Sequence, residues 1–357
     1  MEITYALVLG FYVNGSIPFI DNYTIVPHTT MRAAMIVTLF IFILFSDVSG
    51  SILFSFHNSS DVEYSREYTL DNKEDIQDDT HQCIPSPLWD KNVDLTGYEI
   101  GCDQVQEMIE SGMKHVNKGN IREVFLAEYL GRTVAVKTLI DQSERGRHRH
   151  WVELVAMDVV RGQPHVVDML GFCNTTIVTE AYNNDIKAMV KDYTDPLPMK
   201  SVISISRDAS RGLMSLHEAP GGPIVHFDFK PNQLLINGDS EVKLADFNLS
   251  YFMGRKPDGR TCPFNKKHTR RDRSWIKSPE YLSGKPMTEK VDIYRMGMTF
   301  VFLLTAGRND PIGKDGVIEM DYSWHAEYVK LVQDMLQEND RLRPSARQVV
   351  SRLEKML

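Results

Sequence analysis

The stretch His226-Phe227-Asp228-Phe229-Lys230-Pro231-Asn232-Gln233 decides how this chain is interpreted. It places an acid and a lysine two residues apart, with an amide side chain five residues after the acid. A second acid, Asp246, follows Asp228 by eighteen residues, at the end of the strand-like segment 241–245. One acid can orient a hydroxyl while the other holds a cation, so this pattern is typical of a phosphoryl-transfer site.

With these residues in view, the stretch resembles the catalytic loop of protein kinases, and Asp246-Phe247-Asn248 resembles their metal-binding turn. The resemblance implies that Asp228 is the base at the substrate hydroxyl and that Lys230 lies beside the transferred phosphate. Asp246 would bind Mg²⁺ against the phosphates of ATP. Gln233 stands where kinases usually carry an asparagine for a second Mg²⁺, and its amide oxygen would take that role. Lys230 is the form found in Ser/Thr kinases.

A second group of residues resembles the nucleotide-binding part of kinases. Lys137 ends the apolar strand-like segment Val134-Ala135-Val136-Lys137, and its ammonium can pair with anionic phosphates. The next predicted helix carries Glu153, which the resemblance makes the residue that orients Lys137. Asp158, on the same helix, is the competing candidate for this role.

Residues 117–124 stand in the register of the glycine-rich loop that covers ATP in kinases. Gly119 is the glycine that remains there, and it allows backbone N–H groups to approach phosphates closely. The resemblance implies that Gly119, Val124 and Ala135 contact the nucleotide. Arg122, at an outer position of the loop, is expected to be a solvated strand residue, with a phosphate contact as the alternative.

Segments further along the chain extend the resemblance to about 110–357. The segment 177–182 resembles the hinge between two lobes, where the backbone of Glu180 and Tyr182 would bond the adenine edge. Three later segments resemble the end of the activation segment, the helix that supports the catalytic loop, and the late arginine that pairs with Glu280. They are 278–280, 292–297 and 341–344.

Hydrophobic periodicity predicts the fold class independently of these motifs. Segments 122–130 and 133–139 alternate around Gly131 and predict a β-hairpin. A helix near 146–161 and strands at 165–172 and 176–181 are expected next. Apolar residues at helical spacing then predict four helices. They are expected at 201–217, 288–306, 323–336 and 344–356. The chain is therefore predicted to be α+β, with a small β-rich N-terminal lobe and a larger helical C-terminal lobe.

The N-terminal third predicts an extension and a linker. Residues 1–56 contain an apolar run at 33–45, which is shorter than the roughly 20 residues that a membrane span requires. The run matches the centre of a signal peptide at about 31–50, with a signal anchor reaching residue 56 or a buried core helix as alternatives. A membrane or secretory location is expected, with a cytoplasmic one as the alternative. Residues 57–103 are predicted to be an acidic, disordered linker before a kinase-like domain at 104–357.

Net charge and cysteine content limit the kinds of partner, metal site and cross-link that are expected for this chain. A net charge of −8 gives no reason to expect nucleic acid. The basic stretch 255–277 predicts a protein substrate of acidic character, docking of the acidic stretch 61–79, or a solvated loop. The four cysteines form no CxxC pair, so zinc is not expected, but their number fits disulfides and a reduced cytosolic protein equally well.

Three hypotheses of function follow. The first is a Ser/Thr protein kinase that uses ATP and Mg²⁺, because all the charge-bearing parts are present. The second is a pseudokinase, a nucleotide-binding or scaffold module, because glycines of the loop are lost and Gln233 and Asn248 replace the usual residues. The third is a secretory-pathway kinase that acts on luminal proteins or glycans.

Overall fold

The computed structural model describes residues 83–93, 97–191, 196–238, 241–265, 277–307 and 325–357. The predicted extension 1–56, with its apolar run, and the acidic stretch 61–79 lie outside these residues. Within the described residues, no helix is both long and apolar enough to cross a membrane.

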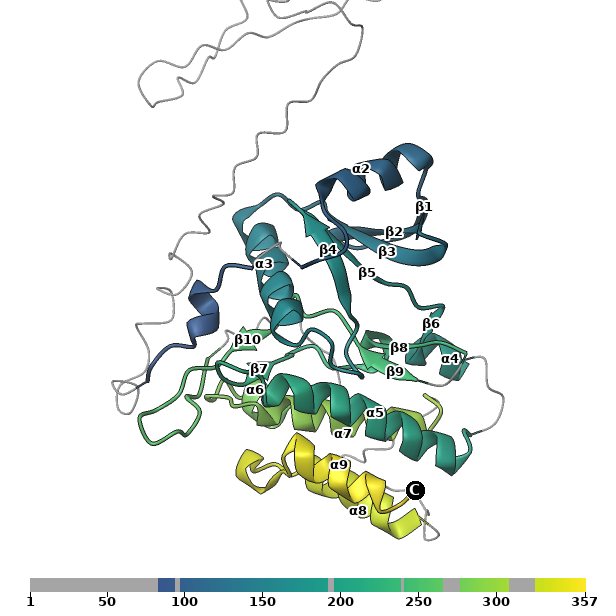
Figure 1. The fold of residues 1–357 in the computed structure, drawn as a ribbon. Coiled ribbons are helices and arrows are strands. Elements are labelled where there is room, and N and C mark those ends of the chain that lie inside the picture. Colours follow the sequence, from purple (N-terminus) through teal and green to yellow (C-terminus); the bar gives the residue numbers. More distant parts are fainter. Residues whose placement is uncertain (1–82, 94–96, 192–195, 239–240, 266–276, 308–324) are drawn as a thin grey trace, which may run out of the picture. The chain divides into compact units, whose positions relative to one another are not determined.

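A five-stranded antiparallel sheet, in the order β1-β2-β3-β5-β4, forms the N-terminal part (Figure 1). Its strands are β1 (Lys114–Lys118), β2 (Arg122–Tyr129), β3 (Arg132–Leu139), β4 (Met169–Cys173) and β5 (Thr176–Glu180). The predicted hairpin is β2–β3, and its turn places Leu130 and Gly131 at φ 50° and 77°. Glycine tolerates this left-handed conformation without a steric penalty, so it fits the turn.

Two helices pack on this sheet, α2 (Cys102–Ser111) on β2 and β4, and α3 (Glu144–Val159) on β3. Ser143 caps the start of α3, because its hydroxyl accepts a hydrogen bond from the backbone N–H of Gly146 at 3.1 Å. A Cβ on Gly146 would lie 1.9 Å from the carbonyl oxygen of Asp141, so only glycine permits this close approach. The start of α3 is thereby fixed against the preceding loop.

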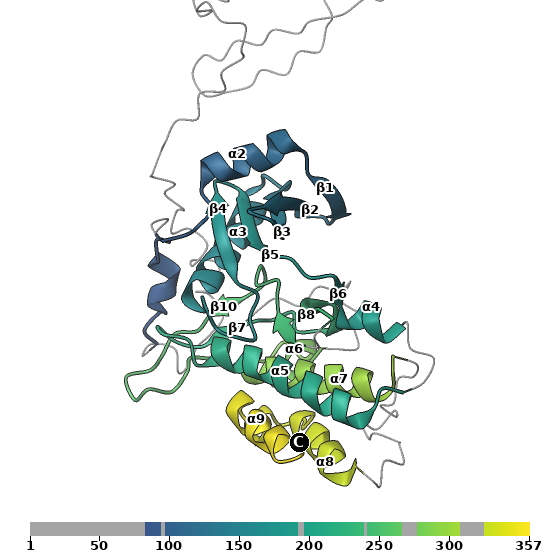
Figure 2. The ribbon, with the colours of Figure 1, turned by 45° about the vertical axis from the view of Figure 1, so that its right-hand side comes forward.

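Helices dominate the C-terminal part. They are α4 (Ile186–Lys191), α5 (Met199–His217), α6 (Pro279–Leu282), α7 (Lys290–Leu304), α8 (Ala326–Met335) and α9 (Ala346–Glu354). The central helix α5 packs against both α7 and α9, as the two views show (Figures 1 and 2). The predicted α+β class, with a β-rich N-terminal part and a helical C-terminal part, is confirmed.

Short strands frame the loops between these helices. They are β6 (Asn184–Asp185), β7 (Ile224–Val225), β8 (Leu234–Ile236), β9 (Val242–Leu244) and β10 (Tyr251–Phe252). Strands β6, β8 and β9 form one small sheet, and β7 pairs with β10. Residues 226–233 therefore leave β7 and enter β8, while Asp246 lies two residues after the end of β9, so paired strands bring the two acids of the sequence pattern to neighbouring loops.

A segment of the predicted linker is folded onto the domain. We name residues 83–93 the N-terminal strap; it contains a 3₁₀ helix, Pro87–Asp90, with Leu88 buried. The indole Nε1 of Trp89 donates to the carbonyl oxygen of Phe252 at 2.8 Å, and its ring stacks on Trp151 of α3. A disulfide ties Cys83 to Cys262. The disordered linker predicted for 57–103 therefore does not extend through these residues, because apolar anchors and a covalent bond fix the segment to the domain.

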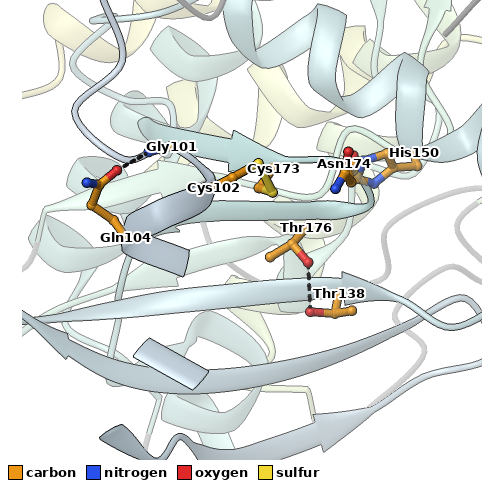
Figure 3. The surroundings of a disulfide bond; sticks show 8 residues. All are labelled: Gly101, Cys102, Gln104, Thr138, His150, Cys173, Asn174 and Thr176. Carbon is orange, nitrogen blue, oxygen red and sulfur yellow. Dashed lines mark hydrogen bonds between the residues drawn. A yellow bond between two sulfur atoms is a disulfide. The ribbon is translucent and has the colours of Figure 1, made fainter. Parts of the chain in front are cut away.

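A second disulfide, Cys102–Cys173, joins the first residue of α2 to the last residue of β4 (Figure 3). Beside it, the hydroxyls of Thr138 and Thr176 share a hydrogen bond of 3.2 Å between β3 and β5. The two disulfides use all four cysteines. The question that the cysteine count left open is thus answered in favour of disulfides.

Candidate active site

The loop 226–233 takes its shape from one buried acid on α7. The carboxylate of Asp292 accepts the backbone N–H groups of His226 at 2.7 Å and Phe227 at 2.9 Å. Burial opposes the charge of Asp292, but its hydrogen bond with His217 and the nearby basic groups outweigh this, so its pKa lies below the usual value. Phe227 sits at φ 60°, a conformation that these bonds hold in place.

Two predicted catalytic residues, Asp228 and Lys230, meet the predicted metal ligands Asp246 and Gln233 in one acid cluster. The ammonium of Lys230 lies 2.6 Å from Oδ2 of Asp228. The amide nitrogen of Gln233 donates to Asp228 at 3.1 Å and to Asp246 at 2.8 Å. Asn248 donates to the other oxygen of Asp246 at 2.6 Å. Gln233 thus links the two acids, and the longer side chain lets it reach both.

The environment of Asp246 favours a bound cation. Burial, followed by the negative charge of Glu153, raises the pKa of Asp246 above its usual value. A divalent cation would offset both effects. A carboxylate and an amide whose oxygen can turn inward are the hard oxygen donors that Mg²⁺ prefers, so Asp246 and Gln233 fit this ion. Asp246 and Gln233 are the residues that would hold it.

The predicted partner of Lys137 is also in place. The ammonium of Lys137 lies 3.5 Å from Oε1 of Glu153, whose side chain is fully buried. Asp158 does not compete, because its carboxylate binds Lys91 at 3.0 Å and the hydroxyl of Tyr98 at 2.6 Å. The register Val124↔Lys137 and Ala135↔Thr179 places the predicted nucleotide contacts on adjacent strands beside this pair.

Comparison with known proteins agrees with this geometry. Residues 112–353 match the family model of the protein kinase domain. The chain belongs to the protein kinase domain family. It is 30% identical to the probable serine/threonine-protein kinase drkA of Dictyostelium discoideum over 285 residues, which cover 74% of the chain and 42% of the relative.

Two plant proteins are similar to the kinase domain as well. The EPD1-interacting receptor-like cytoplasmic serine/threonine-protein kinase 5D of Gossypium barbadense is 31% identical, over 56% of the chain and 43% of the relative. The serine/threonine-protein kinase PBL36 of Arabidopsis thaliana is 29% identical, over 59% of the chain and 45% of the relative. The chain thus spans less than half the length of these relatives.

The kinase domain departs from the sequence prediction at Arg122. Its side chain is only 8% exposed and forms an ion pair with Glu153, so the expectation of a solvated strand residue is wrong. Burial opposes the charge of Glu153, but the charges of Arg122 and then of Lys137 outweigh it and lower its pKa. The alternation along the strand indicated which face of the sheet Arg122 lies on. It did not indicate that α3 would place the carboxylate of Glu153 against that face.

The structure also describes the segments predicted to be the glycine loop and the hinge of the kinase domain. The backbone N–H of Gly119 donates to the carbonyl oxygen of Arg122 at 2.8 Å and closes the turn before β2. The carboxylate of Glu180 accepts the backbone N–H of Asp168 at 2.7 Å and the ammonium of Lys243 at 2.8 Å. These contacts fix the end of β5, from which the chain continues to Tyr182.

Other residues that support the kinase domain's site gave weaker sequence signals. The guanidinium of Arg295, on α7, lies 4.5 Å from the ring centroid of Phe227 and donates to its carbonyl oxygen. Within segment 341–344, Arg343 is the residue that binds Glu280, with contacts of 2.7 and 2.8 Å. Trp89 of the strap had no motif at all. Its packing on α3 depends on segments far apart in the sequence.

Proposed function

We propose that this kinase domain transfers the γ-phosphate of ATP to serine or threonine hydroxyls of a protein substrate. The observation that carries the proposal is the acid cluster, in which Lys230 lies 2.6 Å from Asp228 and Gln233 bridges Asp228 and Asp246. Lys230 supports Ser/Thr rather than Tyr acceptors, and the names of the relatives given above agree. The basic residues of 255–277 favour an acidic segment around the acceptor.

Each residue has a role in this reaction. Asp228 orients the acceptor hydroxyl and takes its proton, and Lys230 offsets charge on the transferred phosphate. Mg²⁺, when bound, neutralises the phosphate oxygens. Asp246 and Gln233 would hold it, while Lys137, oriented by Glu153, would bind the phosphates of ATP. The backbone of Glu180 and Tyr182 would contact the adenine.

Phosphate transfer from ATP with Mg²⁺ to Ser-, Thr- and Tyr-containing acidic peptides tests this proposal. Asp228→Asn removes the base and is expected to lower turnover by about 10²- to 10⁴-fold while nucleotide binding is kept. Glu110→Gln, an exposed change on α2, serves as the control and should leave the rate unchanged. Equal low rates in the wild type and Asp228→Asn, with nucleotide binding intact, would instead favour the pseudokinase alternative.

We further propose that the domain works in the oxidising secretory pathway, as a kinase of luminal proteins or glycans. Two observations favour this compartment over the cytoplasm: all four cysteines form disulfides, which are rare in reducing compartments, and the run at 33–45 matches a signal sequence. Asn174, in the exposed turn between β4 and β5, begins the acceptor sequence Asn174-Thr175-Thr176.

The compartment can be tested with the full chain in cultured animal cells. Alkylation before lysis should find no free thiols, and a glycosidase that removes N-linked glycans should reduce the apparent mass. Asn174→Gln should reduce or abolish that shift, depending on whether other acceptor sequences are used. Four alkylated cysteines in the cellular protein would contradict the proposal and favour a cytoplasmic location.

A further inference from the structure

Arg122 lies on the same face of the sheet as Lys137. In the antiparallel pairing of β2 with β3, Val124 is opposite Lys137 and Arg122 is opposite Leu139. Directly opposed residues share a face, and so do residues two apart along a strand. The side chains of Arg122 and Lys137 therefore project together, towards α3, where both meet Glu153.

The guanidinium of Arg122 has unused donors in this position. Its side chain is 8% exposed, and none of its three nitrogens makes a hydrogen bond to any residue of the described ranges. Its contact with Glu153 is an ion pair alone. Since a buried guanidinium carries five donors, leaving them unfilled costs free energy. The arrangement calls for an acceptor that the described residues do not supply.

Charge points to the nature of that acceptor. Two cations, Arg122 and Lys137, contact the single carboxylate of Glu153. The positive charge of Arg122 acts on Asp246 as well as on Glu153, so Arg122 lies within electrostatic reach of the acid cluster. An anion with several oxygen acceptors would fill the free donors of Arg122 and would be attracted by both cations.

We infer that Arg122 is a second phosphate-binding residue of the nucleotide site, acting beside Lys137 while Glu153 holds both cations. Arg122 occupies an outer position of the glycine loop, directly after the turn closed by Gly119. Its donors form a rigid planar fork that matches two phosphate oxygens at once, whereas a lysine binds as a compact point charge on a flexible stem. The inference rests on the proposed function, because the anion is the phosphate chain of ATP.

Titration calorimetry of Mg·ATP and of adenosine separates phosphate binding from the rest of the site. Arg122→Ala should weaken Mg·ATP by about 10- to 100-fold and leave adenosine within about twofold, because only the phosphates lose a charged hydrogen-bond donor. Arg122→Lys should recover part of the loss. Arg132→Ala, at the exposed end of the same hairpin, is the matched control and should bind both ligands as the wild type does.

Two results would overturn the inference. Equal weakening of ATP and adenosine in Arg122→Ala would mean that Arg122 only supports the fold, and unchanged ATP affinity would mean that it contacts no phosphate. If Arg122→Ala fails to fold, Arg122→Gln, which keeps the volume without the charge, gives the same comparison. A wild type that binds ATP but transfers no phosphate would remove the proposed function alone, whereas a wild type that binds no ATP would remove both.

Discussion

Two buried Arg–Glu pairs, one in each part of the molecule, differ in how completely their polar atoms are satisfied. In the C-terminal part, Arg343 contacts both oxygens of Glu280, at 2.7 and 2.8 Å. Its remaining donors reach the carbonyl oxygens of Gln337 at 2.8 Å and Lys290 at 3.0 Å. This pair leaves nothing for a ligand to complete.

In the N-terminal part, the guanidinium of Arg122 makes no such hydrogen bonds within the described residues, and Glu153 is shared with Lys137. A fully bonded pair stabilises one conformation, whereas a buried pair with unused donors requires an explanation, which the proposed phosphate contact supplies. Two buried pairs of the same chemical kind can therefore serve structure in one place and binding in another.

The largest effect is expected for Arg343→Ala. Removing the arginine leaves the buried charge of Glu280 unpaired, which should lower the free energy of unfolding by about 3–5 kcal/mol. Arg122→Ala, measured without nucleotide, should cost about 1 kcal/mol or less, because Lys137 still faces Glu153 and the unfilled donors are gone. Urea denaturation measures both free energies of unfolding. Equal losses for the two variants would contradict the difference between the two pairs.

A smaller effect is expected when the N-terminal strap is released. Replacing Cys83 and Cys262 by serine opens a link across 179 residues and should cost about 2–4 kcal/mol, with a fall in melting temperature of about 2–4 °C for each kcal/mol. Because Trp89 packs on α3, which carries Glu153, ATP affinity should fall as well.

The pair Cys102 and Cys173, separated by 71 residues, is the matched control for the strap. Its replacement by serine should cost a similar amount, less by about 1 kcal/mol at most, since loop entropy grows slowly with length. If ATP affinity falls equally in both double variants, the strap has no particular connection to Glu153.

The smallest effect is expected in the pH dependence of stability, which should change in two separate pH ranges, here called windows. Burial, and then the charge of Arg122, lowers the pKa of His150 from 6.5 to about 4. The unfolded chain therefore takes up a proton first, and stability falls as the pH drops from about 6.5 to about 4. His150→Gln should flatten this window, as measured by thermal or urea unfolding across it.

The second window belongs to Glu280. Burial opposes its charge, but its bonds with Arg343 outweigh this and lower its pKa below 4.5. The stability that the pair contributes is present above pH 4.5 and is lost as the pH falls through the folded pKa. Glu280→Gln should flatten only this lower window, and a change above pH 5 in that variant would contradict the assignment.

Much of the C-terminal site could be predicted because its residues lie close together in the sequence. Asp228, Lys230 and Gln233 share one loop, and two short paired strands bring Asp246 beside them. Helix periodicity gave α5 within two residues of its observed start at Met199. Local spacing and short connections suffice for such a site.

The N-terminal site could be predicted only in part. Lys137 and Glu153 followed from the resemblance, but the burial of Arg122 depends on how α3 lies against the sheet. The strap was predicted to be disordered because composition does not reveal that Trp89 meets Trp151 or that Cys83 meets Cys262. These contacts join segments that no local pattern relates.

The sequence by itself determined the α+β class, the order of the acids Asp228 and Asp246, and the lysine strand, because periodicity and short-range spacing act within single elements. The tertiary structure alone decided which cation shares Glu153, which arginine binds Glu280, and which cysteines pair. Burial and charge pairing depend on distances between elements, and those distances exist only once the chain has folded.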